Sequence, residues 1–140
     1  MSDPFDLQRF VTAQAPVIDT VRAELRAGRK RSHWMWFVFP QLAGLGSSMM
    51  AQRYAIGSLE EAKAYLAHVV LGPRLVECTE LLLALPDGDI THIMGSPDDV
   101  KLRSCMTLFD AAGNEPCFAA CLGKFYGGQP DEQTLGLLRR

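Results

Sequence analysis

Apolar residues recur three or four positions apart along most of the chain, which is the spacing of one face of an α-helix. Short stretches with glycine or proline interrupt this pattern, as expected between helices. The pattern predicts about seven helices, which begin near Pro4, Pro16, Ser58, Gly72–Pro73, Ser96, Asn114 and Asp131. Only residues 34–39 resemble a strand. The predicted fold class is therefore all-α, and residues 34–39 form either an aromatic-rich loop or one short extended segment after the second helix.

Several predicted helix ends carry recognisable capping residues. Ser58 is followed three positions later by Glu61, which is the capping-box pattern of a helix start. Ser96 precedes a proline and two carboxylates, and this order favours a helix start because the side-chain oxygens accept from free amides. Gly28 suits the left-handed residue that ends a helix. The Gly72–Pro73 pair is predicted to separate two helices.

The composition is that of one ordinary globular domain. The chain has 140 residues, of which 48% are hydrophobic and 21% are charged, and no repeat or low-complexity stretch divides it. A chain of this length buries enough surface to fold without a metal or a disulfide. We therefore expect a single domain over residues 1–140 that needs no cofactor and no metal.

The net charge and the cysteines restrict the cellular compartment and the kinds of partner that the sequence predicts. The formal net charge of −2 excludes a globally basic nucleic-acid-binding protein but allows a local basic patch. No apolar run approaches the roughly 20 residues of a membrane span, and the amino terminus lacks a signal-peptide core. The four cysteines form no C-x-x-C pair, so buried free thiols are expected rather than a zinc site. These features predict a cytoplasmic protein.

The most unusual stretch is residues 29–41, which combines cations, a histidine and aromatic rings. Four of the twelve aromatic residues lie between positions 34 and 39, shortly after Arg29, Lys30 and Arg31. A buried aromatic side chain removes about 150–250 Å² from water, so most of these rings must face the core. Because so short a segment turns its side chains to opposite faces, we expect some of the rings to line a groove.

Cations beside tryptophan suit an anionic ligand with a planar ring, because phosphate binds arginine or lysine and a ring stacks on tryptophan. The predicted ligand-binding residues are Arg29, Lys30, Ser32, His33, Trp34, Trp36, Gln41 and Lys101. Lys101 joins the set if the helix that begins at Ser96 closes over the aromatic segment. The glycine-bearing stretch 44–48 would let backbone amides approach the ligand, and Ser47 or Ser48 would open a further helix.

Each of these residues also has a structural interpretation. The ring-rich run is equally typical of a plug in the core. His33 can donate to a backbone carbonyl, and the basic triplet 29–31 is also typical of a solvated helix end. Asp98 and Lys101, three positions apart on one helix, are suited to an exposed ion pair.

The run Ser32-His-Trp-Met-Trp-Phe-Val-Phe-Pro-Gln-Leu42, followed by Gly44-Leu-Gly46, resembles the bacterial domain of unknown function 1810 family. Blocks at 54–56, 61–66, 71–75 and 101–109 are similar to the same family, so the resemblance covers nearly the whole chain. It implies a small, mainly helical cytosolic protein of unestablished activity. Some members carry a calpastatin label, which does not fit a globular chain because the segments of that inhibitor are disordered.

The order of these blocks is also similar, more distantly, to the NADAR family of helical proteins that handle ADP-ribose-like N-glycosides. That resemblance implies binding or hydrolysis of a small nucleotide or ADP-ribose-like anion, as by an N-glycosidase, and it transfers no catalytic residue. From the residues of this chain, Asp98 or Glu61 is the candidate to activate water. The cations would steady the phosphates while positive charge develops on the ribose.

Other classes of function remain open. Aromatic and arginine residues are also enriched at protein interfaces, so an exposed aromatic face would suit a protein partner or a homodimer. Nucleic-acid binding through residues 22–31 is a third class, which the acidic net charge disfavours. We prefer the small anionic ligand, because cations, a histidine and stacking rings coincide in one short segment.

Overall fold

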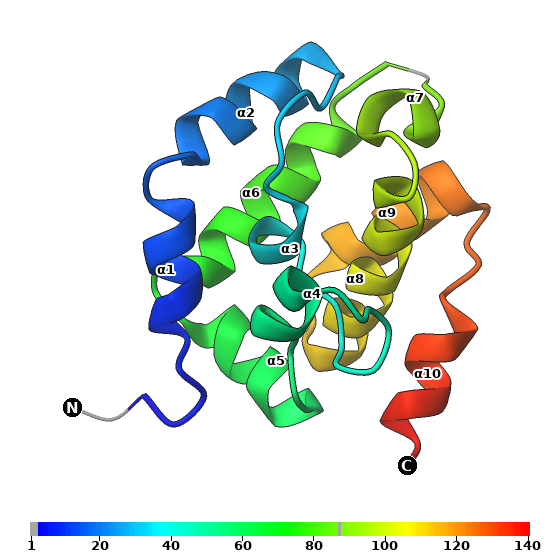
Figure 1. Cartoon of the computed structure of the whole chain (residues 1–140). Coiled ribbons are helices and arrows are strands. Elements are labelled where there is room, and N and C mark those ends of the chain that lie inside the picture. Colours follow the sequence, from blue (N-terminus) through cyan, green and yellow to red (C-terminus); the bar gives the residue numbers. More distant parts are fainter. Residues whose placement is uncertain (1–2, 87) are drawn as a thin grey trace.

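The computed structural model describes residues 3–86 and 88–140, and it confirms the all-α prediction (Figure 1). The described residues form ten helices, of which seven have seven or more residues. The longer helices are α1 (Gln8–Gln14), α2 (Ile18–Ala27), α5 (Leu59–Ala67), α6 (Leu71–Leu83), α8 (Asp98–Ala112), α9 (Pro116–Tyr126) and α10 (Glu132–Leu138). The short helices are α3 (Met35–Val38), α4 (Met49–Arg53) and α7 (Ile90–Met94). In the described part of the chain, no helix combines the length and the apolar composition that crossing a bilayer requires.

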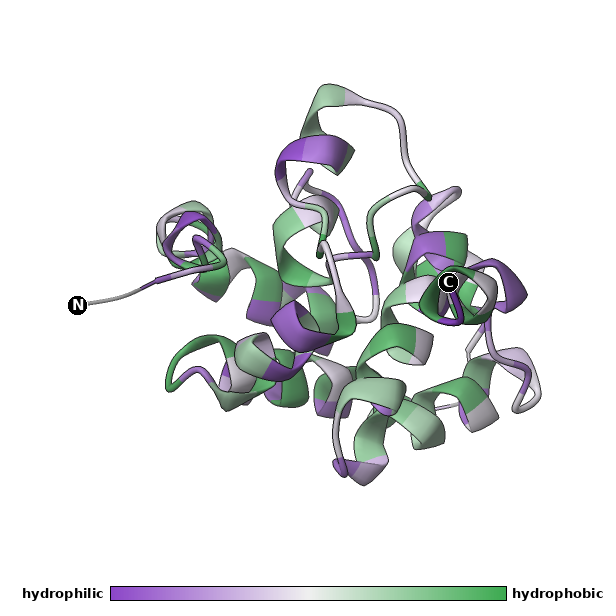
Figure 2. Ribbon diagram, turned by 90° about the horizontal axis from the view of Figure 1, so that it is seen from below, coloured by the Kyte–Doolittle hydropathy of each residue, from purple (hydrophilic) through white to green (hydrophobic). Residues whose placement is uncertain are grey.

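Helices α5, α6, α8 and α9 pack on one another at the centre, and α2 lies against α6 (Figure 1). α8 is the most deeply embedded, with eight buried residues. Rings join the helices within this core: the Tyr65 ring centroid lies 5.2 Å from that of Phe109, which lies 6.0 Å from that of Phe118. Figure 2 shows hydrophobic and hydrophilic residues on the same helices, as expected of helices that bury one face.

The predicted start of α5 is half confirmed. The Ser58 hydroxyl accepts from the amide of Glu61 at 3.1 Å, so Ser58 caps the helix as predicted. The reciprocal half of the capping box is wrong, because the Glu61 carboxylate accepts from the Gly57 amide and from Arg9. Glu61 therefore ties the start of α5 to two other parts of the chain.

Two other predicted boundaries are shifted. α8 begins at Asp98 without a side-chain cap, so the predicted cap by Ser96 is wrong. The Gly72–Pro73 pair lies in the first turn of α6, where a proline needs no hydrogen-bonded amide, and the predicted break falls instead at residues 68–70. Gly28 ends α2 in the left-handed conformation as predicted, with φ of 73°.

The aromatic-rich stretch is helical over α3, so the alternative of an extended segment is wrong. Among the described residues, pairing of extended chain is limited to one parallel bridge between Leu42 and Ile56. Within residues 34–39 only the Trp36 side chain is partly exposed, and the others are buried. The interpretation as a core plug is thus confirmed for most of the rings, and Trp36 is left at the surface.

The four cysteines are free and buried, as predicted. Burial raises the pKa of the Cys78 and Cys121 thiols to about 12. Both thiols are therefore protonated at neutral pH and act as small hydrophobic side chains.

Candidate functional site

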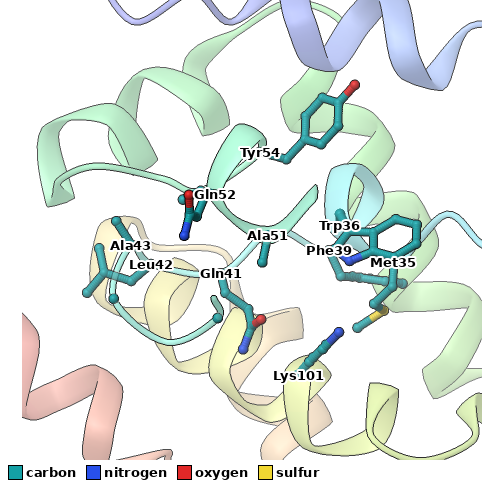
Figure 3. A pocket seen from close by; sticks show the side chains of 13 residues that line it. Met35, Trp36, Phe39, Gln41, Leu42, Ala43, Ala51, Gln52, Tyr54 and Lys101 are labelled. Atoms are coloured by element: carbon teal, nitrogen blue, oxygen red, sulfur yellow. The ribbon is translucent and has the colours of Figure 1, made fainter. Parts of the chain in front are cut away.

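A cavity of about 170 Å³ lies where α3, α4 and α8 approach one another (Figure 3). One wall comes from α3 and the residues after it, and the opposite wall comes from residues 41–46 and from α4 with the residues that follow. α8 contributes a single cation. The lining residues are Met35, Trp36, Phe39, Gln41, Leu42, Ala43, Gly44, Gly46, Ala51, Gln52, Tyr54, Ala55 and Lys101.

Three side chains predicted to bind a ligand border this cavity: Trp36 and Gln41 from one short segment, and Lys101 from α8. Lys101 Nζ lies 5.9 Å from the centroid of the Trp36 ring. Figure 3 shows the Lys101 ammonium near the Gln41 amide and the Trp36 ring. Lys101 is partly buried and forms no ion pair with any described carboxylate. A cation beside an aromatic ring, with no anion of its own, is suited to the negative charge of a ligand.

Gly44 and Gly46, from the glycine-bearing stretch 44–48, line the cavity, and the path of the chain requires both glycines. Gly44 has φ of 102°, a left-handed conformation that favours glycine. A Cβ on Gly46 would lie 2.6 Å from the Cβ of Ala51, so no side chain fits between this stretch and α4. Ser48, one of the two predicted caps, accepts from the Ala51 amide and opens α4.

Lys30 and Trp34 form a second lysine–tryptophan pair, which lies outside the cavity lining. Lys30 Nζ lies 4.9 Å from the centroid of the Trp34 ring and 2.9 Å from Asp98 Oδ2. The Lys30 side chain is 6% exposed, and Trp34 is fully buried. The alternative of an Asp98–Lys101 ion pair is wrong, because Asp98 pairs with Lys30. This pair ties the segment before α3 to the start of α8.

Glu24 organises the chain that leads into α3, and no sequence pattern indicated this role. Its buried carboxylate accepts from the Arg31 amide at 2.8 Å, from the Ser32 hydroxyl at 2.6 Å and from the Trp34 indole at 3.0 Å. Burial by itself raises the pKa of Glu24, but these hydrogen bonds favour the charged form and lower it to about 2. Glu24 is therefore ionised at neutral pH and fixes the chain before α3.

Three other predicted ligand-binding residues lie outside the cavity lining. The side chains of Arg29 and His33 are exposed, and the Ser32 hydroxyl is bound to the Glu24 carboxylate. Of the eight predicted ligand-binding residues, the structure brings together Trp36, Gln41 and Lys101. The cation of the site comes from α8 and not from the basic triplet.

Neither predicted catalytic carboxylate lines the cavity. Asp98 is paired with Lys30, and Glu61 lies 3.0 Å from Arg9 and accepts from the Gly57 amide at 2.9 Å. Both carboxylates are thus engaged in contacts that hold the fold.

The rings of residues 34–39 do not form an exposed face. The large hydrophobic side chains that are exposed in the described part of the chain are Met49, Val69 and Val100. They lie on α4, on the link between α5 and α6, and on α8. The surface expected for a protein partner is therefore not made by the aromatic segment.

The lining residues that the sequence did not indicate are all uncharged. Met35, Phe39 and Ala51 carry no chemical signature and face the cavity only because of how α3 and α4 pack. Gln52 and Tyr54 could have been predicted from the sequence, since a helix that begins after Ser48, next to the glycines, places them beside the predicted groove.

The sequence also places the chain among known proteins. A profile of the family described as Protein of unknown function (DUF1810) matches residues 4–138. The chain belongs to this family. The resemblance of the tryptophan-rich run and of the later blocks is thereby confirmed. Because the family description names no activity, the function of this DUF1810 protein must be argued from its cavity.

A solved structure agrees with the fold of this DUF1810 protein. The present chain is similar to the crystal structure of the conserved hypothetical protein Rv1873 from Mycobacterium tuberculosis, with a TM-score of 0.97. The two chains are 60% identical, and the match covers 99% of each. No curated protein matches the chain.

Proposed function

We propose that this DUF1810 protein binds a small anionic ligand with a planar ring, of the nucleotide or ADP-ribose type, in the cavity beside α3. The observation that carries the proposal is that Lys101, Trp36 and Gln41 border one cavity. The Lys101 ammonium binds negative charge, and the Trp36 ring stacks against the ligand ring. The Gln41 amide both donates and accepts, so it can hydrogen-bond to the edge of a heterocycle.

The volume of the cavity sets which part of the ligand it encloses. A cavity of about 150 Å³ in another protein holds one benzene molecule, whereas sites that enclose whole drug-sized ligands measure about 300–1,000 Å³. The 170 Å³ of this cavity therefore suits a single ring. We assign the nucleobase, or a comparable heterocycle, to the cavity and the rest of the ligand to its mouth.

Binding finds more support than hydrolysis. A general base must lie within hydrogen-bond reach of the water that it activates, and no carboxylate belongs to the lining. Asp98 and Glu61 are each held by a cation. Self-association or a protein partner finds less support, because the exposed large apolar side chains are scattered over three elements.

Fluorescence titration tests the proposal. In Trp34→Phe the only tryptophan is Trp36, so its emission reports on the cavity. ADP-ribose, AMP and inorganic phosphate are titrated separately. Stacking predicts that ADP-ribose and AMP change the Trp36 emission and raise the melting temperature, whereas phosphate alone leaves the emission unchanged.

Two lysine variants show whether the signal comes from the cavity. Lys101→Met removes the cation and is expected to weaken binding of AMP about tenfold or more, because a charge-assisted contact to phosphate is lost. Lys63→Met, at an exposed position on α5, is the matched control and should bind as wild type does. If millimolar ADP-ribose and AMP change neither emission nor melting temperature, the proposal is wrong.

A further inference from the structure

Residues 42–56 leave the core and return to it at the same place, and they form the outer wall of the cavity. Leu42 and Ile56, both buried, are joined by the parallel bridge, and the Ala43 amide donates to the Ile56 carbonyl at 2.8 Å. Between these ends, α4 contains no buried residue. A surface loop with joined ends and little buried area can open locally without disturbing the core.

One end of this loop is held by an arginine from α1. Arg9 Nε donates to the Arg53 carbonyl at 2.9 Å, and Nη2 donates to the Ala55 carbonyl at 2.8 Å. These two carbonyls flank Tyr54, a residue of the cavity wall whose ring packs against Phe10 and Phe37. The guanidinium therefore holds the backbone on both sides of a lining residue.

The remaining donors of Arg9 are also used. Nη2 donates to the Glu61 carboxylate at 3.0 Å, and Nη1 donates to the carbonyls of Phe5 and Asp6 at 2.6 and 2.8 Å. A guanidinium has five N–H donors, so all of them are engaged. Glu61 in turn accepts from the Gly57 amide at 2.9 Å, just beyond the loop. The Arg9–Glu61 pair thus clamps residues 53–57 between α1 and α5.

The other end of the loop is held much less firmly. Residues 43–49 are mostly exposed, and even a Cβ added at Gly44 would reach only the Leu137 side chain of α10, at 3.5 Å. Gly44 and Gly46 both lie in this half and leave little side chain to pack. The two halves of the loop therefore differ in how strongly they are attached.

We propose that Arg9, braced by Glu61, is the positioning residue of the cavity. It fixes residues 53–55 so that Tyr54 and Ala55 keep their places in the wall while the glycine-bearing half of the loop lifts to admit a ligand. This inference rests on the proposed function for the identity of the ligand, but it concerns side chains outside the lining. It gives Glu61 a role in holding the site instead of in acid–base chemistry.

The first test needs no ligand. Amide hydrogen exchange is measured for residues 54–57, whose amides are all hydrogen-bonded, and for α8 and α9. Arg9→Met is expected to speed exchange at 54–57 about tenfold and to leave α8 and α9 unchanged, because only the wall is released. In the Trp34→Phe background, acrylamide should also quench Trp36 more strongly.

Matched variants separate the clamp from a general loss of charge. Arg9→Lys keeps the charge but has three donors on one atom, so it should behave as Arg9→Met does. Arg22→Met removes another arginine, one that pairs with Asp19 and Glu77, and should leave residues 54–57 unchanged. Glu61→Gln is a milder change, because the amide keeps an acceptor for Gly57, and it should speed exchange at residues 54–57 less than Arg9→Met does. This variant replaces Arg9→Met in the test if Arg9→Met does not fold.

The second test uses AMP and ADP-ribose as the probes. Arg9→Met is expected to weaken their binding about tenfold. Arg22→Met should weaken it less, even when the two variants have the same melting temperature. If wild type binds neither probe, the proposed function fails, and exchange and quenching still judge the clamp. Unchanged exchange at 54–57 in Arg9→Met, or equal acceleration throughout α8 and α9, overturns the inference.

Discussion

The segment around α3 supplies two tryptophans, and each lies beside a lysine, yet the two pairs have different roles. Lys30 and Trp34 are buried, and a carboxylate, Asp98, neutralises the lysine at 2.9 Å. Lys101 and Trp36 are partly exposed, and no described carboxylate pairs with the lysine. The same two residue types therefore serve the fold in one place and border the cavity in the other.

The difference shows that an anion within the fold decides whether a cation can serve a ligand. A lysine whose charge is already balanced and desolvated cannot bind a second anion without losing its first partner. Asp98 forms its ion pair with Lys30. Lys101, one helical turn later on α8, therefore has no carboxylate partner from this turn and can bind the charge of a ligand. Asp98 therefore separates the two pairs, although it does not line the cavity as the predicted catalytic base would.

The largest expected contrast lies between the two tryptophans. Trp34→Ala should destabilise the protein by about 3–5 kcal/mol, because it leaves a large cavity and removes a donor from Glu24. Trp36→Ala, at a partly exposed position, should cost about 1 kcal/mol. Urea denaturation measures both, and an equal loss for the two variants would contradict the assignment of Trp34 to the core.

The two lysines give the next contrast. Lys30→Met leaves Asp98 unpaired and should destabilise the protein by about 2–3 kcal/mol, below a fully buried case because Asp98 keeps some solvent contact. Lys101→Met should change stability by less than about 0.5 kcal/mol. The double variant Lys30→Met/Asp98→Asn is the control and should recover part of the loss. No recovery would mean that packing of the Lys30 chain, and not its charge, matters.

The stability of the protein should depend on pH through the titration of Glu24, which holds the buried Trp34. Its pKa is about 2 in the fold against an ordinary value of 4.5, so the folded state favours the charged carboxylate. This contribution, on the order of 3 kcal/mol, is present above pH 4.5 and is lost as the pH falls toward 2. Glu24→Gln should be less stable at pH 7 and should lose less stability over this window. Parallel curves for the two proteins would count against the assignment.

The smallest expected effect is the difference in solvent access between the two tryptophan rings, and it is simple to measure. With Trp36 as the only tryptophan, in Trp34→Phe, acrylamide should quench the emission efficiently. With Trp34 as the only tryptophan, in Trp36→Phe, quenching should be weak because that ring is fully buried. Equal quenching of the two single-tryptophan proteins would remove the distinction on which the site rests.

Much of the helical fold could be predicted, because it depends on local signals. Ser58, Gly28 and the apolar periodicity act within a few residues, and the structure confirms them. One wrong prediction, the reciprocal capping contact of Glu61, needed information from elsewhere in the chain, because that carboxylate binds Arg9. Another was a local rule that was misapplied. The break predicted at Gly72–Pro73 is absent because a proline in a first turn is tolerated.

Part of the cavity lining could be predicted. Trp36 and Gln41 were predicted from the aromatic run, and Lys101 followed from the condition that α8 closes over it. Arg29, Lys30 and His33 were predicted on the same grounds but lie outside the cavity lining. Residues adjacent in sequence are not adjacent in a cavity when one turn of chain sends their side chains to opposite sides.

The sequence by itself determined the all-α class, most of the helix starts, the buried free thiols and one of the segments that line the cavity. These features follow from periodicity and from contacts between near neighbours. Only the tertiary structure decided which lysine is neutralised, which tryptophan is enclosed, and that Arg9 and Glu61 meet at the wall of the cavity. Ion pairing and burial depend on which distant side chains share a space, and that is settled only when the helices pack.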